Sequence, residues 1–126
     1  MAATIRDLKV WQEAVALAAE VVRAARQSSR REAKAVTDQL MTTALSAAAT
    51  IAEGYGRFTP PEQRQLYRTA KRELLRLENH LAIARQADLL TPATHAELSN
   101  RIQGVHRLLN GYLIYLERQV TAEPRA

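Results

Sequence analysis

The chain has 126 residues, 47% of them hydrophobic, which is enough apolar material for the core of one domain and too much for a disordered polymer. It contains no cysteine, which excludes disulfides, thiol catalysis and cysteine-ligated zinc, and no run of roughly 18 apolar residues that would span a membrane. The net charge of +5 combines 18 basic with 13 acidic residues, so it permits a polyanionic partner without establishing one.

The first predicted helix covers residues 8–27. Its apolar residues recur at intervals of three and four, which places them on one face of an α-helix. These residues are Leu8, Trp11, Val15, Ala18, Val22 and Ala25. Asp7 precedes them and is predicted to be the N-cap, because its carboxylate can accept a hydrogen bond from a free backbone N–H. Trp11 is the single tryptophan, and we expect it to anchor the core or a subunit interface.

The second predicted helix, residues 30–55, is the one against which the others are expected to pack. Ser29 and Glu32 have the spacing of a capping box at its start. Its apolar face carries Ala33, Val36, Leu40, Ala44, Ala47, Ile51 and Tyr55. The small residues on this face let a partner helix approach closely. Gly54 and Gly56 follow, and we expect them to end the helix in the left-handed conformation.

Two Thr-Pro pairs predict the starts of the last two helices, residues 60–88 and 92–119. In each pair the threonine is a natural N-cap and the proline suits the first helical position. The apolar faces of these helices carry Leu66, Ala70, Leu74, Leu77, Leu81 and Ala84, and then Leu98, Ile102, Val105, Leu109, Tyr112 and Leu116. Gly104 and Gly111 each cost the last helix roughly 1 kcal/mol relative to alanine, and close packing is the role we consider for them. Residues 120–126 are expected to form a flexible tail.

Four amphipathic helices with short connections predict an all-α domain spanning residues 1–126, an antiparallel up-down-up-down four-helix bundle. Met41, Leu45 and Ala48 flank the main face of the second helix, so this helix carries more apolar surface than one core needs. We therefore predict self-association into a homo-oligomer. The predicted interface residues are Trp11, Met41, Leu45, Ala48 and Tyr55.

The sequence favours a protein without enzymatic activity. Di-metal carboxylate bundles use Glu-x-x-His pairs, whose side chains lie one helical turn apart and reach a shared metal. The residues three positions before the three histidines are Leu77, Pro92 and Gln103, and none is a glutamate. Ser46 lacks the strand–turn–helix context of a catalytic nucleophile, and no glycine-rich phosphate loop is present. We predict no cofactor and no metal site.

A row of basic residues at spacing four lies along the third predicted helix. It consists of Arg64, Arg68, Arg72 and Arg76, with Lys71 beside it and His80 next in the row. The row turns by about 40° around the helix at each step. Like charges at this spacing repel, so acids such as Glu73 and Glu78, a partner helix or phosphate groups should offset them. With Arg57, the four arginines and Lys71 form the predicted nucleic-acid-binding set, which would contact phosphates without reading bases. A solvated face balanced by acids is the alternative.

Two segments of the chain resemble a known bacterial family. They are Asp7-Leu8-x-Val10-Trp11 and Ser46-x-x-x-x-Ile51-Ala52-Glu53-Gly54-Tyr55-Gly56-Arg57. Over residues 5–118 the chain resembles the four-helix-bundle proteins encoded in intervening sequences of 23S ribosomal RNA genes. That group includes the accessory variability proteins of diversity-generating retroelements. The resemblance implies an antiparallel four-helix bundle that assembles into a ring-like homopentamer without catalytic activity. For the retroelement branch it also implies binding to nucleic acid and to a reverse transcriptase.

The chain departs from the family's usual pattern at three places. Thr42-Thr43 stands where the family has an arginine pair, Thr50 replaces an asparagine, and Arg72-Glu73 replaces a glycine–serine pair. The arginines of the third helix are therefore candidates to replace a lost RNA contact on the second. Since the N-terminus lacks the pattern of a signal peptide, we predict a cytoplasmic accessory protein that binds RNA or DNA. The alternative function is a protein-interaction scaffold with no nucleic-acid role.

Overall fold

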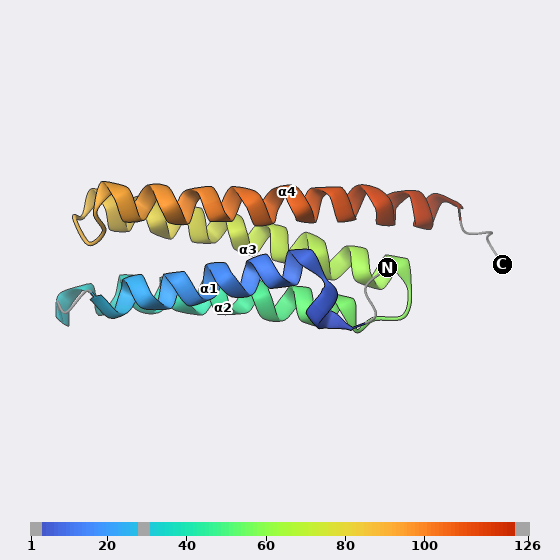
Figure 1. The fold of residues 1–126 in the computed structure, drawn as a ribbon, viewed down its shortest axis with the longest axis horizontal. Helices are drawn as coiled ribbons and strands as arrows, with labels where there is room; N and C mark the ends of the chain where they lie inside the picture. The colour runs from blue at the N-terminus through green and yellow to red at the C-terminus, as the bar shows by residue number, and fades with distance from the viewer. Residues whose placement is uncertain (1–3, 28–30, 123–126) are drawn as a thin grey trace.

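The computed structural model describes residues 4–27 and 31–122 (Figure 1). Its four α-helices are α1 Lys9–Gln27, α2 Lys34–Tyr55, α3 Pro60–Gln86 and α4 Pro92–Ala122, and two short 3₁₀ turns are η1 Ile5–Asp7 and η2 Arg31–Ala33. No strand occurs in these two ranges, so the prediction of an all-α fold with four helices is confirmed. The same ranges contain no helix with the length and apolar character needed to cross a membrane.

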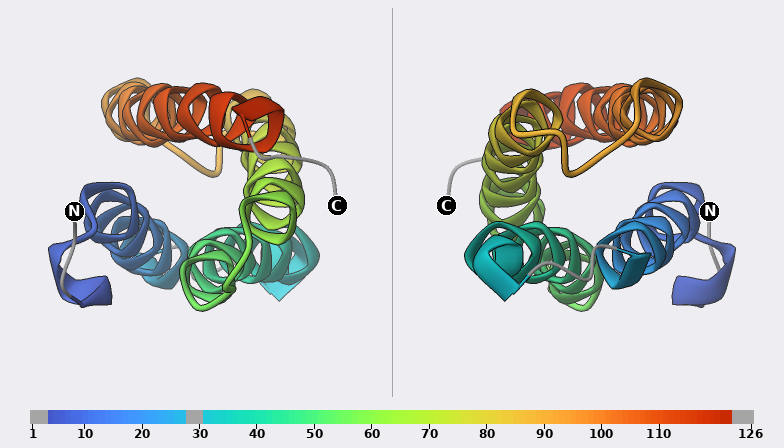
Figure 2. Two further views of the ribbon diagram at one scale, coloured as in Figure 1. Left: turned by 90° about the vertical axis from the view of Figure 1, so that its right-hand side faces the viewer. Right: turned by 90° about the vertical axis from the view of Figure 1, so that its left-hand side faces the viewer.

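Each helix packs against two others, and neighbours in the chain are neighbours in space. α1 contacts α2 and α4, and α3 contacts the same two helices. In Figure 1, α1 ends and α2 begins at the left, α2 gives way to α3 at the right, and α3 to α4 at the left again. The end-on views in Figure 2 show the helices in the order α1, α2, α3, α4 around a common centre.

The core fills that centre with aliphatic side chains, and the apolar faces predicted for α2, α3 and α4 form it, except that Leu66 of α3 is only partly buried outside the core. Their fully buried members include Leu40, Ala44, Ala47, Ile51, Ala70, Leu74, Leu77, Leu81, Ala84, Leu98, Ile102, Val105, Leu109 and Leu116. Val36, Tyr55 and Tyr112 are partly buried and pack against this core. Tyr67 was not expected there, yet it is completely buried on α3.

The buried face of α1 is rotated relative to the predicted one. Its buried residues are Val10, Ala14, Leu17, Ala18, Val21 and Ala25. Trp11 and Val22 are only partly buried, and Val15 is exposed. Both sets have helical spacing, because apolar residues cover more than half of the circumference of α1. The contacts with α2 and α4 decide which set faces the core, and the sequence of α1 alone does not contain them.

The predicted N-caps of α3 and α4 are confirmed. The Thr59 Oγ1 accepts a hydrogen bond from the backbone N–H of Glu62 at 3.4 Å. The Thr91 Oγ1 accepts one from the backbone N–H of Thr94 at 3.1 Å. A proline follows each threonine at the start of its helix, where the missing N–H would have no intrahelical partner.

The predicted N-cap of α1 is wrong. That helix begins at Lys9, and the Asp7 carboxylate accepts a hydrogen bond from the backbone N–H of Thr4 at 3.2 Å. Asp7 therefore closes the short turn η1 and does not cap the helix that follows. The capping box predicted at Ser29 and Glu32 lies outside the described residues and side chains.

The prediction that Gly54 and Gly56 end α2 in the left-handed conformation is also wrong. Gly54 lies inside α2, and Gly56 has a right-handed helical backbone with φ of −78°. The left-handed residue is Asp88, with φ of 62°. The backbone N–H of Leu89 donates to the carbonyl of Ala84 at 2.9 Å, which is the outer hydrogen bond of a Schellman helix end.

Two predicted helix ends differ from the structure. Because the Schellman turn closes α3, this helix ends at Gln86, two residues before its predicted end. α4 ends at Ala122, so the predicted tail is wrong for residues 120–122. The stretch from Tyr112 to Ala122 contains neither proline nor glycine, and the Thr121 hydroxyl donates to the carbonyl of Glu117 at 2.9 Å. Residues 123–126 lie outside the described part of the chain.

Candidate nucleic-acid interface

Five of the six predicted nucleic-acid-binding residues lie on α3, and we call them the α3 basic row. They are Arg64, Arg68, Lys71, Arg72 and Arg76. Arg68, Arg72 and Arg76 are exposed, and the other two are partly exposed. The sixth predicted residue, Arg57, is exposed in the connection between α2 and α3.

The α3 basic row crosses the outer surface of α3 from its α4 side to its α2 side. Near its start, Arg68 forms an ion pair with Glu117 of α4. Beyond its end lies His80, two helical turns from Glu73, whose Oε2 accepts a hydrogen bond from the Ser46 hydroxyl of α2. The structure thus shows the same gradual rotation that the spacing of four predicts.

Two of the six predicted residues have acidic partners. Arg57 pairs with Glu53 one turn earlier, at 3.0 Å, and Arg68 pairs with Glu117. Both pairs are about half exposed, and exposed ion pairs contribute at most about 1 kcal/mol each. Such pairs leave the side chains free to exchange an acid for another anion.

The remaining cations of the row have no acidic partner in the part of the chain that the structure describes. Among those residues, no carboxylate lies within 4 Å of Arg64, Lys71 or Arg76, and Arg72 donates to the Thr69 hydroxyl at 3.1 Å. Glu73, which was expected to balance the row, contacts Ser46 of α2. Within the described residues, acids therefore balance two of the six predicted cations through ion pairs, and the solvated face stays the alternative.

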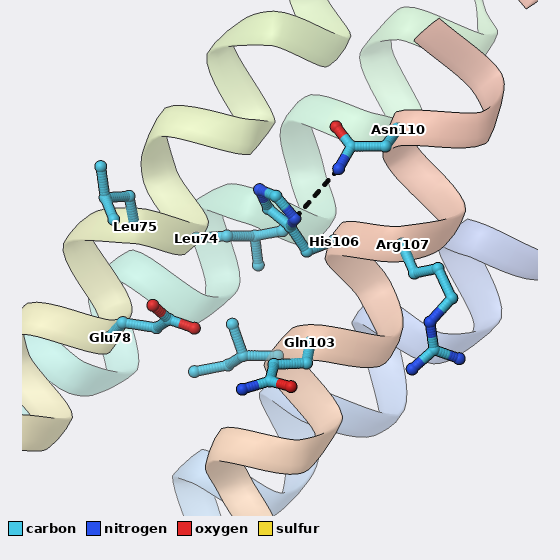
Figure 3. Close-up of a pocket in the computed structure, with 8 residues that line it drawn as sticks. Leu74, Leu75, Glu78, Gln103, His106, Arg107 and Asn110 are labelled. Atoms are coloured by element: carbon cyan, nitrogen blue, oxygen red, sulfur yellow. Dashed lines mark hydrogen bonds between the residues drawn. The ribbon is translucent and has the colours of Figure 1, made fainter. Parts of the chain in front are cut away.

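A groove between α3 and α4 borders the basic row. Its first hollow has a volume of about 670 Å³ and is lined by Arg68 and Lys71 of α3 and by Asn110, Leu113, Glu117 and Arg118 of α4. The second, of about 490 Å³, adjoins it at Asn110. In the second hollow the Asn110 Nδ2 and the His106 Nδ1 lie 3.2 Å apart. Figure 3 shows both side chains on α4, with Glu78 projecting from α3.

Arg107 and Arg118 of α4 were not predicted as site residues. Eleven positions separate them, which is three helical turns, so both lie on one face of α4. Arg118 shares the first hollow with Arg68 and Lys71. Arg107 lines the second hollow together with Glu78 and Asn110. The spacing of eleven residues is visible in the sequence, but the position of these arginines relative to the α3 basic row depends on how α3 and α4 pack.

Clusters of potential metal ligands are absent from the described residues. Within residues 4–27 and 31–122, no three histidine, aspartate or glutamate side chains gather closely enough to hold a metal ion.

The predicted oligomer-interface residues lie on two helices, Trp11 on α1 and the other four on α2. Met41, Leu45 and Ala48 follow one another at spacings of four and three on α2, and Leu45 is 55% exposed while Ala48 is buried. Trp11 is partly buried at the edge of the core. Tyr55 lies elsewhere, near a group of other tyrosines.

All four tyrosines of the chain gather toward the end of the bundle where α2 gives way to α3. The rings of Tyr67 and Tyr112 meet edge to face with centroids 5.3 Å apart, and those of Tyr112 and Tyr115 with centroids 6.1 Å apart. Burial raises the pKa of Tyr67 and of Tyr112 above 10, and neighbouring tyrosines, Tyr55 among them, raise both further. Tyr67 and Tyr112 are therefore uncharged near neutral pH.

A family model described as 23S rRNA-intervening sequence protein matches residues 6–111 of the chain. The match begins in η1 and ends in the second half of α4, so it includes the α3 basic row and the Gly54 segment. A comparison with curated proteins gives no match.

Proposed function

The chain belongs to the 23S rRNA-intervening sequence protein family, and on that premise we propose a non-enzymatic, homo-oligomeric helical bundle that binds nucleic acid through the α3 basic row. The observation that carries the proposal is the state of Arg64, Lys71 and Arg76. These side chains lie along α3 without an acid within 4 Å in the described residues. Phosphate groups would relieve the repulsion between residues four apart in the α3 basic row.

The position of the row also supports contact with a nucleic-acid backbone. Arg118 of α4 lies across the first hollow from Lys71, so cations flank the groove on both sides. Charges arranged in this way neutralise phosphates and release counterions, which gives affinity without a choice of sequence. The proposed ligand is therefore RNA or DNA bound by its backbone.

A comparison of two double variants tests this proposal. Arg72→Gln/Arg76→Gln removes two charges from the basic row, and Arg23→Gln/Arg26→Gln removes two charges from α1. Both variants have the same net charge, so they separate a localised contact from general attraction. We expect the first variant to weaken binding to labelled RNA about tenfold or more. The slope of its affinity against salt concentration should correspond to about two fewer phosphate contacts. The second variant should bind nearly as the wild type does. Equal losses in both variants would contradict the proposal.

The proposed architecture is an antiparallel up-down-up-down bundle that assembles as a ring-like homopentamer. Support for the bundle comes from the chain direction in Figure 1, which reverses from each helix to the next. Support for assembly comes from Leu45, whose large apolar side chain remains 55% exposed beside Met41. Light scattering should give a mass five times that of the 14.1 kDa chain. A mass of one chain in dilute solution would remove the assembly claim.

A protein-interaction scaffold in the cytoplasm is the second candidate. It is favoured by exposed apolar side chains beside the groove, namely Leu75 on α3 and Ile114 on α4. A reverse transcriptase is the partner that the family resemblance suggests. Arg68→Glu/Arg72→Glu separates the two candidates. If this variant changes the oligomer mass and leaves RNA affinity intact, the scaffold explains the protein better.

A further inference from the structure

Phe58 is the most exposed large apolar side chain among the described residues. It lies in the connection between α2 and α3, and 97% of its surface is accessible to solvent. A phenylalanine in this position adds nothing to the core, because folding removes almost none of its area from water. Its neighbour in the chain, Arg57, is also exposed. Folding therefore does not account for this aromatic ring, and a ligand can.

A second exposed aromatic ring lies at the same end of the molecule. Tyr115 of α4 is 51% exposed, and its ring rests against Tyr112, which in turn contacts Tyr67. Tyr67 lies against Gly54, four residues before Phe58. In Figure 1 the α2–α3 connection and the C-terminal end of α4 both lie at the right. The two exposed rings thus share one end of the bundle, and the tyrosine contacts hold the second ring in place.

Cations accompany both rings. Arg57 precedes Phe58 in the chain, and Arg118 follows Tyr115 by one helical turn. Arg64 lies in the second turn of α3, close to the same connection. An apolar protein partner would have to remove water from these charges to reach Phe58, which is unfavourable. Aromatic rings interspersed with cations are instead the chemistry that binds unpaired nucleic-acid strands, because bases stack on the rings while cations contact the phosphates.

We infer that this end of the bundle binds single-stranded nucleic acid, with bases stacked on Phe58 and Tyr115 and phosphates held by Arg57 and Arg118. The inference rests on the proposed function and narrows its ligand from nucleic acid in general to unpaired strands. In a duplex each base is already stacked between its neighbours and offers no free face to a protein ring. Stacking is available to every base, so the site has little sequence preference.

Three labelled probes of one length test the inference by fluorescence anisotropy. They are a single strand, the duplex of the same sequence, and a single strand whose bases are replaced by abasic sites. The wild type should bind the intact strand about five- to a hundredfold more tightly than the abasic strand, and more tightly than the duplex. Equal, salt-dependent affinity for all three probes would overturn the inference and leave the proposed function standing. No binding to any probe would overturn both.

Variants at the two rings separate stacking from apolar contact. Phe58→Leu and Tyr115→Leu keep apolar bulk and remove the aromatic face, whereas Phe58→Trp and Tyr115→Phe keep it. The leucine variants should lose about five- to a hundredfold in affinity for the intact strand and none for the abasic strand, while the aromatic variants retain affinity. Ile83→Ala, at an exposed apolar residue near the other end of α3, should change nothing. If Phe58→Leu retains affinity for the intact strand, the inference is wrong. If it also lowers the oligomer mass, Phe58 is a subunit contact.

Discussion

The ring of Tyr67 occupies the space beside Gly54 that a larger residue would need. A Cβ atom at residue 54 would lie 2.9 Å from the Tyr67 Cε1 and 3.2 Å from its Cδ1. The tyrosine is completely buried, so its ring cannot swing away. This contact explains the glycine of the Ile51-Ala52-Glu53-Gly54 segment by the packing of α2 against α3. The conformation of the helix end does not require it.

Alanine substitutions at three glycines should have opposite effects on stability. Gly54→Ala forces the Tyr67 ring to shift, and we expect a loss of about 1–3 kcal/mol in the free energy of unfolding. A methyl group at Gly104 or Gly111 of α4 would meet no neighbouring atom of the described residues within 4 Å, so close packing does not explain these two glycines. Gly104→Ala and Gly111→Ala should each gain up to about 1 kcal/mol from helix propensity. Denaturant titration measures all three, and a stabilising Gly54→Ala would contradict the packing account.

The buried hydroxyl of Tyr67 should make the fold sensitive to alkaline pH. Its oxygen is buried without a hydrogen-bond partner among the described residues, and burial raises its pKa above 10. Above pH 10 the unfolded chain loses this proton while the folded chain keeps it, so stability falls with rising pH by about 1.4 kcal/mol per pH unit. Tyr67→Phe should remove that part of the slope and cost nothing at neutral pH. An unchanged alkaline slope, followed by thermal unfolding at several pH values, would show that the hydroxyl is not responsible.

The left-handed residue at the end of α3 offers a stabilising substitution. Asp88 has φ of 62°, a conformation that costs a non-glycine residue about 1 kcal/mol. Asp88→Gly should therefore raise the free energy of unfolding by roughly 0.5–1 kcal/mol. The ion pair that it removes, with Arg85 at 3.6 Å, is exposed and contributes little. Asp88→Ala is the control and should destabilise, because alanine tolerates the left-handed conformation less well than aspartate does. A stabilising alanine would contradict the explanation.

Substitutions of Ser46 and Glu73 should have strongly non-additive effects on the free energy of unfolding. The serine hydroxyl donates to Oε2 of the glutamate, while Oε1 is buried with no partner in the described part of the chain. Ser46→Ala leaves more of the carboxylate without hydrogen bonds and should cost about 1–3 kcal/mol. In the Ser46→Ala background, Glu73→Leu should recover that loss, because it removes the group left unpaired. A double-mutant cycle in denaturant measures the coupling, and simple addition of the two effects would mean that the residues act independently.

Local sequence signals were sufficient for most of the fold. Thr59 and Thr91, each followed by proline, marked the starts of α3 and α4 because capping depends on neighbours in the chain. Two of the failures depend on contacts between helices. The orientation of α1 was wrong because its apolar residues cover two faces, and the role of Gly54 was wrong because Tyr67 is thirteen positions away on another helix.

The candidate site was only partly predictable for the same reason. The α3 basic row has a period along one helix, so the sequence reveals it directly. Arg118 joins it only through the packing of α4 against α3. The exposure of Phe58 carried no signal in the sequence, because it depends on where the surrounding helices lie.

The salt dependence of wild-type binding to a labelled RNA strand tests the central claim most directly. If the α3 basic row and Arg118 contact phosphates, the logarithm of the association constant should fall linearly with the logarithm of salt concentration. About six contacts to a single strand predict a slope of about −4. A slope near zero, or no binding at micromolar protein, would contradict a function in binding nucleic acid.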